Sequence, residues 1–158
     1  MGHFLKDSQK PNYPQKYFEQ NKKTPLMSKI FSPLLNLFYY LKTESIKNFV
    51  NKTNPKILDF GCGSGKLVDR FQNQGIEING FEPSKGALNL THRNKLPVYN
   101  FVKAVPGGYD LIMLWHSLEH IDQPFEAIKK IKQFLSKDGK ILIAVPNGDS
   151  FDAKIFNV

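Results

Sequence analysis

Residues 56–68 read KILDFGCGSGKLV, and this stretch decides the fold of the chain. The apolar pair Ile57-Leu58 predicts a short buried parallel strand, and Asp59 follows near the end of that strand. Three alternating glycines predict a turn, and Lys66-Leu67-Val68 begins an amphipathic pattern that predicts a helix. Glycines let the backbone approach a ligand closely, and a helix N-terminus offers free N–H groups. The stretch therefore predicts a nucleotide-binding strand–turn–helix unit.

Two glycine patterns compete for the identity of that nucleotide. The dinucleotide fingerprint G-x-G-x-x-G would place its third glycine at position 66, which is a lysine. A pyrophosphate would also lie close to Asp59, where like charges repel. A ligand that has a positive charge and no phosphate, such as S-adenosylmethionine, suits this acid better. An NAD-dependent oxidoreductase is therefore disfavoured, and a purely structural turn is the other alternative.

The pattern G-x-G-x-G, with an acid two residues before its first glycine, resembles the first motif of class I S-adenosylmethionine-dependent methyltransferases. In that family the glycine loop wraps the methionine part of the cofactor. The resemblance implies that the cofactor is S-adenosyl-L-methionine. It also implies cofactor contacts from the acid and the loop: Asp59, Phe60, Gly61, Cys62, Gly63 and Gly65. Cys62 is the one cysteine of the chain, and we expect it to be a small packing residue of the loop and not a nucleophile.

A second strand is predicted at Ile76–Phe81, and Glu82 stands at its C-terminal end. Glu82 lies about twenty residues beyond the glycine loop, where a βαβ nucleotide-binding unit places its ribose-binding acid. The sequence GFEPS also resembles the second motif of the methyltransferase family, which implies cofactor contacts from Glu82 and Pro83. A charged strand end without a ligand is the alternative.

The third predicted strand, Leu96–Phe101, departs from the family pattern. Many members carry an acid shortly after this strand that binds the adenine amino group. Here the residues are Asn100-Phe101-Val102-Lys103, and the next acid is Asp110. We expect adenine to be held by apolar contacts and backbone groups around residues 100–102, or to be bound weakly.

A fourth strand is predicted at Tyr109–Leu114, and the segment WHSLEHIDQP follows it as residues 115–124. With VPN after a fifth strand at Gly139–Val145, this segment resembles methyltransferases of the ubiquinone-biosynthesis type and their relatives acting on small molecules. The resemblance implies cofactor contacts from Trp115 and His116. If the acceptor is a hydroxyl, histidine has a suitable pKa for a general base; His116 is the first catalytic candidate and His120 the second.

Other roles remain open for this segment. Glu119 could orient a histidine or, together with His120, help to ligate a divalent metal, although we predict no metal site. Alternatively, the segment only fixes the loop and caps the helix that follows it, which is predicted to run to about Leu135.

These elements predict an α/β fold, a doubly wound and mostly parallel Rossmann-like sheet of about five strands in the order 3-2-1-4-5. We expect one domain, with a core at residues 55–158 and an N-terminal extension at residues 1–54. Apolar residues recur at helical spacing over residues 25–50, and Pro33 predicts a break into two helices, with Ser32 as the cap of the second. We expect these helices to pack on the sheet or cover the cofactor; a membrane-surface or partner contact through residues 26–50 is the alternative.

Composition narrows the class of protein. The 158 residues are 41% apolar and 23% charged, which is ordinary for a globular domain. The net charge of +8 comes from lysines spread along the chain, so we expect no nucleic-acid partner. One cysteine excludes an intrachain disulfide, and neither a signal peptide nor a membrane span is evident, so we expect a cytoplasmic protein.

The sequence thus predicts a methyltransferase that uses S-adenosylmethionine and methylates a small-molecule acceptor, with O-methylation favoured. Related enzymes usually continue past the fifth strand into an acceptor-binding region, whereas this sequence ends at Val158. We therefore expect either a fragment or an acceptor wall supplied by the N-terminal helices and a partner. The alternative function is a degenerate member of the family that binds cofactor or a partner without turnover.

Overall fold

The computed structural model describes residues 25–146 of the chain, and residues 1–24 and 147–158 lie outside the described part. Its elements, in chain order, are α2 (Pro25–Val50), β1 (Ile57–Phe60), α3 (Lys66–Asn73), β2 (Ile78–Phe81), α4 (Lys85–Arg93), β3 (Val98–Tyr99), η2 (Val102–Ala104), β4 (Tyr109–Trp115), η3 (Leu118–His120), α5 (Pro124–Ile131), η4 (Lys132–Phe134) and β5 (Leu135–Ala144). The strands form one sheet in the order β3-β2-β1-β4-β5, and every pairing is parallel. This confirms the predicted strand order and fold class.

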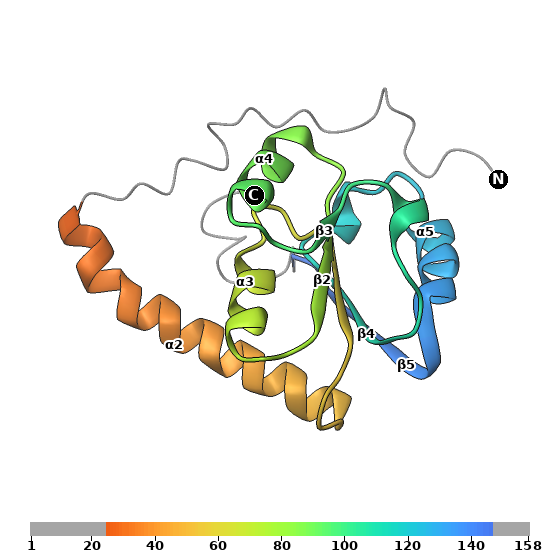
Figure 1. Ribbon diagram of the computed structural model, residues 1–158, viewed down its shortest axis with the longest axis horizontal. Coiled ribbons are helices and arrows are strands. Elements are labelled where there is room, and N and C mark those ends of the chain that lie inside the picture. Colours follow the sequence, from red (N-terminus) through yellow and green to blue (C-terminus); the bar gives the residue numbers. More distant parts are fainter. Residues whose placement is uncertain (1–24, 147–158) are drawn as a thin grey trace.

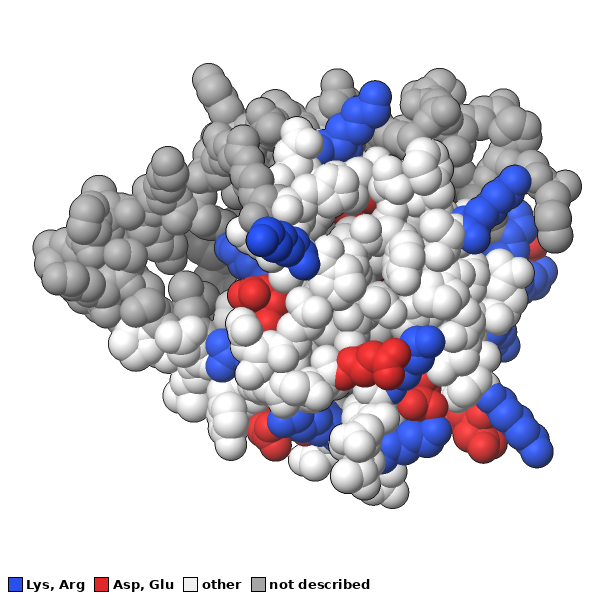
Figure 2. All heavy atoms as spheres, in the orientation of Figure 1, with Lys and Arg blue, Asp and Glu red and all other residues white. Residues whose placement is uncertain are grey.

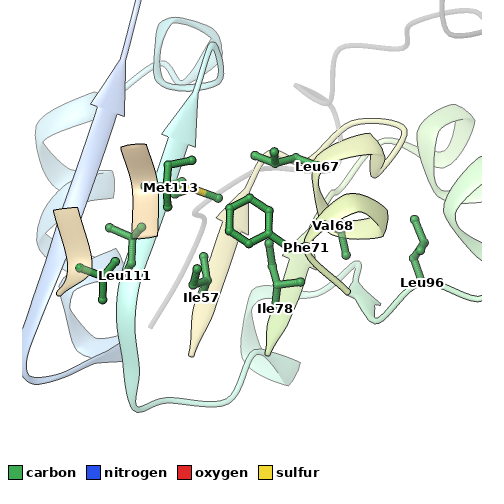
Figure 3. Close-up of a cluster of buried hydrophobic side chains, with 10 residues drawn as sticks. Ile57, Leu67, Val68, Phe71, Ile78, Leu96, Leu111 and Met113 are labelled. Carbon is green, nitrogen blue, oxygen red and sulfur yellow. The ribbon is translucent and has the colours of Figure 1, made fainter. Parts of the chain in front are cut away.

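The sheet has helices on both faces, with α2 and α3 on one side and α5 on the other (Figure 1). β1 and β4 are central and buried on both faces, so their side chains alternate between two cores. On the first face Phe71 of α3 points into the cluster formed around Ile57, Ile78 and Met113 (Figure 3). The second cluster includes Leu58 of β1 and packs the sheet against α5. The two cores share the same central strands.

α3 follows the glycine loop as predicted. Leu67, Val68 and Phe71 are its buried residues, which is the apolar stripe expected of an amphipathic helix on a sheet. Gly75 has a φ of +73°, its N–H donates to the Gln72 carbonyl, and the next N–H donates to the Phe71 carbonyl. These two bonds form a Schellman motif, so Gly75 ends the helix as the sequence predicts.

The prediction of two helices within residues 25–50 is wrong. α2 is one helix of 26 residues, and Pro33 lies inside it instead of at the start of a second helix. Proline removes one backbone hydrogen bond and favours a kink, but it does not force a break when the turns on either side continue the helix. Ile46 and Val50, near the end of α2, belong to the first core cluster. The expectation that residues 25–50 pack on the sheet or cover the cofactor stays a prediction for the rest of the helix.

The limits of β3 and β5 differ most from the prediction, whereas β2 begins two residues later and β4 ends one residue later than predicted. β3 pairs only through Val98 and Tyr99, so it is shorter than the predicted residues 96–101. β5 begins at Leu135 instead of Gly139, and the helix before it ends at Ile131 with a short 3-10 turn. A register shift interrupts the β4–β5 pairing next to Tyr109, where a Cβ on Gly139 would lie 2.5 Å from the Tyr109 carbonyl oxygen. Glycine therefore marks a bulge in β5 and not its beginning.

Positive and negative side chains are interspersed on the face drawn in Figure 2, as the scattered lysines of the sequence predict. Within residues 25–146, no helix is both long enough and apolar enough to cross a membrane. Several large apolar side chains of α2 are exposed: Leu34, Leu37, Tyr40, Leu41 and Phe49. The membrane-surface or partner contact through residues 26–50 stays a prediction.

Candidate functional site

The sheet brings the predicted site residues together at one edge. β1 and β2 are paired so that Phe60 lies opposite Phe81, and β4 lies on the other side of β1. The glycine loop, Glu82 and residues 115–120 each follow one of these three strands, so all of them gather beyond the carboxyl ends of the strands. Ligands bind at this edge in open α/β sheets, where the strand order reverses.

Hydrogen bonds fix the glycine loop to the neighbouring strand. The N–H groups of Gly61 and Cys62 both donate to the Phe81 carbonyl, at 2.8 and 3.1 Å. Gly61, with a φ of +86°, also lies against the segment after β4, since a Cβ there would come within 2.5 Å of the Ser117 Cβ. The Ser117 hydroxyl donates to the Phe60 carbonyl at 2.8 Å and closes this contact. Nothing in the sequence singled out Ser117, because its partner lies 57 residues away.

Gly63 and Gly65 have different surroundings. At Gly63 a Cβ would meet no atom within 4 Å, so the backbone there faces open space that a ligand can approach. Gly65 is the residue before α3, and a Cβ there would lie 2.5 Å from Leu96. Both residues have left-handed φ values, +55° and +76°. Gly63 therefore offers a cradle, whereas Gly65 is required for packing.

Asp59 is the buried acid of the site. Its exposure is 4%, and it lies near the end of β1, where the charges of Lys42 and Glu82 act on it. Burial raises the pKa of Asp59 to about 7, the positive charge of Lys42 works against this rise, and the charge of Glu82 adds to it. A buried carboxylate is costly unless a hydrogen-bond donor, a cation or a proton accompanies it. The site thus favours a ligand with a positive charge.

Lys42, which the sequence did not single out, reaches this acid from α2. Its ammonium lies 3.3 Å from the centroid of the Trp115 ring, a cation–π contact at the end of β4. Burial lowers the pKa of Lys42 to about 8, and the charge of Asp59 partly opposes this change. Lys42 lies one helical turn before the buried Ile46, so a lysine on the inward stripe of α2 was the signal available in the sequence.

Glu82 is buried and already accepts two backbone hydrogen bonds. One comes from the Gly63 N–H at 2.9 Å and the other from the Ser84 N–H at 2.7 Å. Burial raises the pKa of Glu82, and these two bonds work against the rise. Glu82 thereby ties the end of β2 to the glycine loop. A carboxylate oxygen can accept more than one hydrogen bond, so the geometry is compatible with the predicted ribose contact.

Cys62 is half-buried and packs beneath the loop. A Cβ on Gly80 would lie 2.6 Å from the Cys62 sulfur, so the thiol fills the space above that glycine of β2. Burial and the nearby carboxylates of Asp59 and Glu82 raise the pKa of the thiol. A thiol with a raised pKa is a poor nucleophile at neutral pH, which agrees with the packing role expected from the sequence.

The Phe60 ring takes part in packing, because it lies 4.5 Å from the Phe81 ring within the second core cluster. Pro83 is half-buried beside Glu82. Beyond β3, Phe101 has an exposure of 64%, and Val102 is partly buried. The predicted cofactor contacts of Phe60 and Pro83 stay predictions. The predicted adenine site around residues 100–102 also stays a prediction.

The predicted catalytic histidines follow β4. His116 is exposed, has a left-handed φ of +50°, and donates its backbone N–H to the Ala144 carbonyl at 2.8 Å. Its Nδ1 lies 3.7 Å from Glu119 Oε1, within range of an ion pair when the imidazole is protonated. His120 is exposed at the end of η3. Within residues 25–146 no three His, Cys, Asp or Glu side chains are grouped to hold a metal ion.

Comparison with known proteins identifies the family. A model described as "Methyltransferase domain" matches residues 34–157, which is most of the sequence. The chain belongs to this methyltransferase family. Its residues 34–146 within that match include the glycine loop, Glu82 and the histidine segment described above.

Named relatives share the family and the fold. The chain is 25% identical over 118 residues to a ubiquinone biosynthesis O-methyltransferase of Nitrosococcus oceani, covering 68% of this chain and 50% of the relative. It is 31% identical over 110 residues to an uncharacterized methyltransferase of Bacillus cereus, covering 64% and 51%. The solved structure of the plantazolicin methyltransferase BpumL in complex with SAH matches with a TM-score of 0.66 at 22% identity, over 91% of this chain and 61% of that one. The chain thus spans about half the length of the curated relatives it matches.

Proposed function

We propose that this chain binds S-adenosylmethionine beyond the carboxyl ends of β1, β2 and β4 and transfers its methyl group to a small-molecule acceptor. The observation that carries the proposal is Asp59, a buried carboxylate near the end of β1 on which the positive charge of Lys42 acts. Bound S-adenosylmethionine supplies an electrophilic methyl group on a positively charged sulfur, together with an α-ammonium group. Membership of the methyltransferase family and the SAH bound to BpumL support this choice of ligand.

The surrounding residues suit the other groups of that ligand. Gly63 presents open backbone for close approach, and Glu82 can accept hydrogen bonds from ribose hydroxyls. Asp59 and Glu82 would together repel a carboxylate, whereas Lys42 carries a positive charge that acts on Asp59. We assign Lys42 to the carboxylate of the methionine part of the cofactor. Asp59 and Lys42 would then hold opposite ends of one amino-acid group.

For the acceptor we propose a hydroxyl, with His116 as the general base. The bound cofactor would supply the electrophilic methyl group to the hydroxyl oxygen and leave as a neutral thioether, and the His116 imidazole would accept the hydroxyl proton. Glu119 Oε1 lies 3.7 Å from His116 Nδ1, within range of an ion pair with the imidazolium that results. His120 is the second candidate for the same role. Positioning the acceptor would supply much of the acceleration, because the sulfur leaves as a neutral group.

Calorimetric titration with S-adenosylhomocysteine tests the cofactor part. We expect Asp59→Asn to weaken binding by about tenfold to a hundredfold, the loss of one charge-assisted contact. Lys42→Met and Glu82→Gln should also weaken binding. The matched control is Asp69→Asn, because Asp69 is an exposed acid in the first turn of α3 and should leave the affinity unchanged.

The absence of saturable heat with the unaltered chain up to millimolar ligand would refute the proposal. Equal weakening by Asp59→Asn and Asp69→Asn would instead refute the role of Asp59. Saturable binding without transfer to any acceptor would favour the degenerate, non-catalytic member of the family.

A further inference from the structure

An open groove of about 550 Å³, called the cavity below, lies between α2 and the side of the sheet formed by β4 and β5, and Leu41, Ser45 and Phe49 on its α2 wall are exposed. One wall is formed by α2 side chains at helical spacing: Leu41, Ser45, Ile46 and Phe49. The facing wall is formed by Trp115 of β4 and Leu142 of β5. This volume is within the range of small-molecule sites, about 300–1,000 Å³. The cavity is large enough to hold a ring with a substituent chain.

The chemistry of the lining restricts what the cavity can hold. Apart from the Ser45 hydroxyl, which donates to the Leu41 carbonyl within α2, the described lining is aliphatic, aromatic or the Lys42 side chain. Lys42 supplies a positive charge, and no acid is among the described lining residues. A cation in this cavity would find no acid to pair with, whereas an uncharged apolar molecule would bury apolar surface at little electrostatic cost, because Lys42 is assigned to the carboxylate of the cofactor.

The cavity reaches the carboxyl end of β4. Trp115, which lines it, is the last residue of that strand, the Lys42 ammonium lies over the Trp115 ring, and the Lys42 charge acts on Asp59. His116, the proposed base, follows Trp115 directly in the chain. A molecule in the cavity would therefore have one end at the Lys42–Trp115 pair, where the proposed cofactor and base also lie.

We propose that this cavity is the acceptor site and that the acceptor is a largely apolar, uncharged molecule whose hydroxyl lies at the Lys42–Trp115 end of the cavity. The assignment rests on the proposed function, since an acceptor requires the methyl donor beside it. It assigns a specificity role to α2, whose side chains form most of the wall and which precedes the first strand of the sheet.

Trp115 is the one tryptophan of the sequence, so its fluorescence reports on this cavity. The probe is 4-butylphenol, with excitation at 295 nm to avoid the phenol, titrated into the full chain. We expect a saturable change in Trp115 emission. Ser45→Phe, which places a ring in the cavity, should weaken the apparent affinity at least tenfold. The matched control is Asn48→Phe, which adds the same ring at an exposed α2 position that is not among the lining residues.

Two further measurements sharpen the test. 4-Butylbenzylammonium, a cation of similar shape, should bind at least tenfold more weakly than 4-butylphenol. Phe49→Ala removes part of the wall and should also weaken binding; it keeps the test valid if Ser45→Phe does not fold. Both variants should bind S-adenosylhomocysteine within twofold of the unaltered chain.

The outcomes separate this inference from the proposed function. No saturable response, equal effects of Ser45→Phe and Asn48→Phe, or equal binding of the cation would overturn the acceptor site while S-adenosylhomocysteine still binds. Binding of the phenol that depends on Ser45, without any binding of S-adenosylhomocysteine, would overturn the proposed function, and the acceptor assignment would fail with it.

Discussion

At the scale of single residues, Asp59 and Lys42 are the unusual features of this molecule. Asp59 is buried and Lys42 is half-buried, and each has a pKa displaced toward neutrality, to about 7 for Asp59 and about 8 for Lys42. Ionisable groups with such displaced pKa values often mark functional sites, because burial that costs stability is retained where a ligand uses it. We therefore expect the site to reduce the stability of the free protein.

The pH dependence of unfolding tests this cost. Between pH 3.8 and about 7, folded Asp59 holds a proton that the unfolded chain has released, so its contribution lowers stability as the pH rises through this window and is constant above it. A pKa displaced from 3.8 to about 7 corresponds to roughly 4 kcal/mol as an upper value. The variant Asp59→Asn has no group that titrates at this position. The free energy of unfolding of this variant should therefore increase relative to that of the unaltered chain as the pH rises from 4 to 8.

Urea unfolding followed by circular dichroism at pH 4, 6 and 8 measures this difference. Asp69→Asn, the exposed control, should differ from the unaltered chain by the same amount at each pH. A stability difference for Asp59→Asn that does not grow between pH 4 and pH 8 would contradict the raised pKa.

At the scale of elements, the glycine loop depends on contacts that come from far away in the chain. Gly61 combines a left-handed φ of +86° with a close approach to Ser117 in the segment after β4. Alanine at this position adds backbone strain and a clash of Cβ atoms at 2.5 Å. The loop is thus held between β2 and the residues that follow β4.

We expect Gly61→Ala to destabilise the fold by about 2–4 kcal/mol, the combined scale of left-handed strain and overpacking. Gly63→Ala has a left-handed φ as well but meets no atom within 4 Å, so it should cost only about 1–2 kcal/mol. Thermal unfolding of the two variants measures the difference. Equal losses of stability would show that the contact with Ser117 adds nothing to the strain.

The elements also show how far the sequence could predict this structure. The strand before the loop, the glycine turn, α3 and its end at Gly75 follow from residues that are close together in the chain, and these predictions are confirmed. Pro33 was misread because the propensity of one residue did not overcome a helix that continues on both sides. β5 was misread because its bulge at Gly139 depends on a contact with Tyr109 in another strand.

The candidate site divides in the same way. Asp59 and Glu82 were predicted because one stands near the end of an apolar strand and the other about twenty residues beyond the glycine loop, and the structure places both toward the same edge of the sheet. Their contacts with a cofactor stay predictions. Lys42 and Ser117 were not predicted. Lys42 extends from α2 to the Trp115 ring at the end of β4, and Ser117 donates a hydrogen bond to the Phe60 carbonyl, 57 residues earlier in the chain. Contacts of this kind depend on tertiary packing, which local spacing does not record.

At the scale of the whole molecule, the two cores on opposite faces of the sheet share β1 and β4. Ile46 of α2 lies in the first cluster and Ile131 of α5 lies in the second. Because the central strands contribute alternate side chains to both clusters, neither core can be lost while the other stays intact. We expect the sheet, α2 and α5 to unfold in one transition.

Ile46→Ala and Ile131→Ala test this cooperativity, since each should cost about 2–5 kcal/mol through lost burial and the cavity left behind. Circular dichroism and Trp115 fluorescence should give coincident thermal transitions in the unaltered chain and in both variants. A transition of Trp115 that precedes the loss of helix in Ile46→Ala would show that α2 separates from the sheet on its own. An exposed substitution on the same helix, Asn48→Ala, should leave the midpoint within the error of measurement.

The position of Cys62 has a consequence for the kinetics of the molecule. Its thiol is packed against Gly80 beneath the glycine loop and is held in the unreactive, protonated form. A disulfide reagent would react with it mainly when the loop separates from the Phe81 carbonyl and uncovers the sulfur. The sequence contains no other cysteine, so all thiol labelling of the chain occurs at Cys62. The labelling rate therefore measures how often the glycine loop opens.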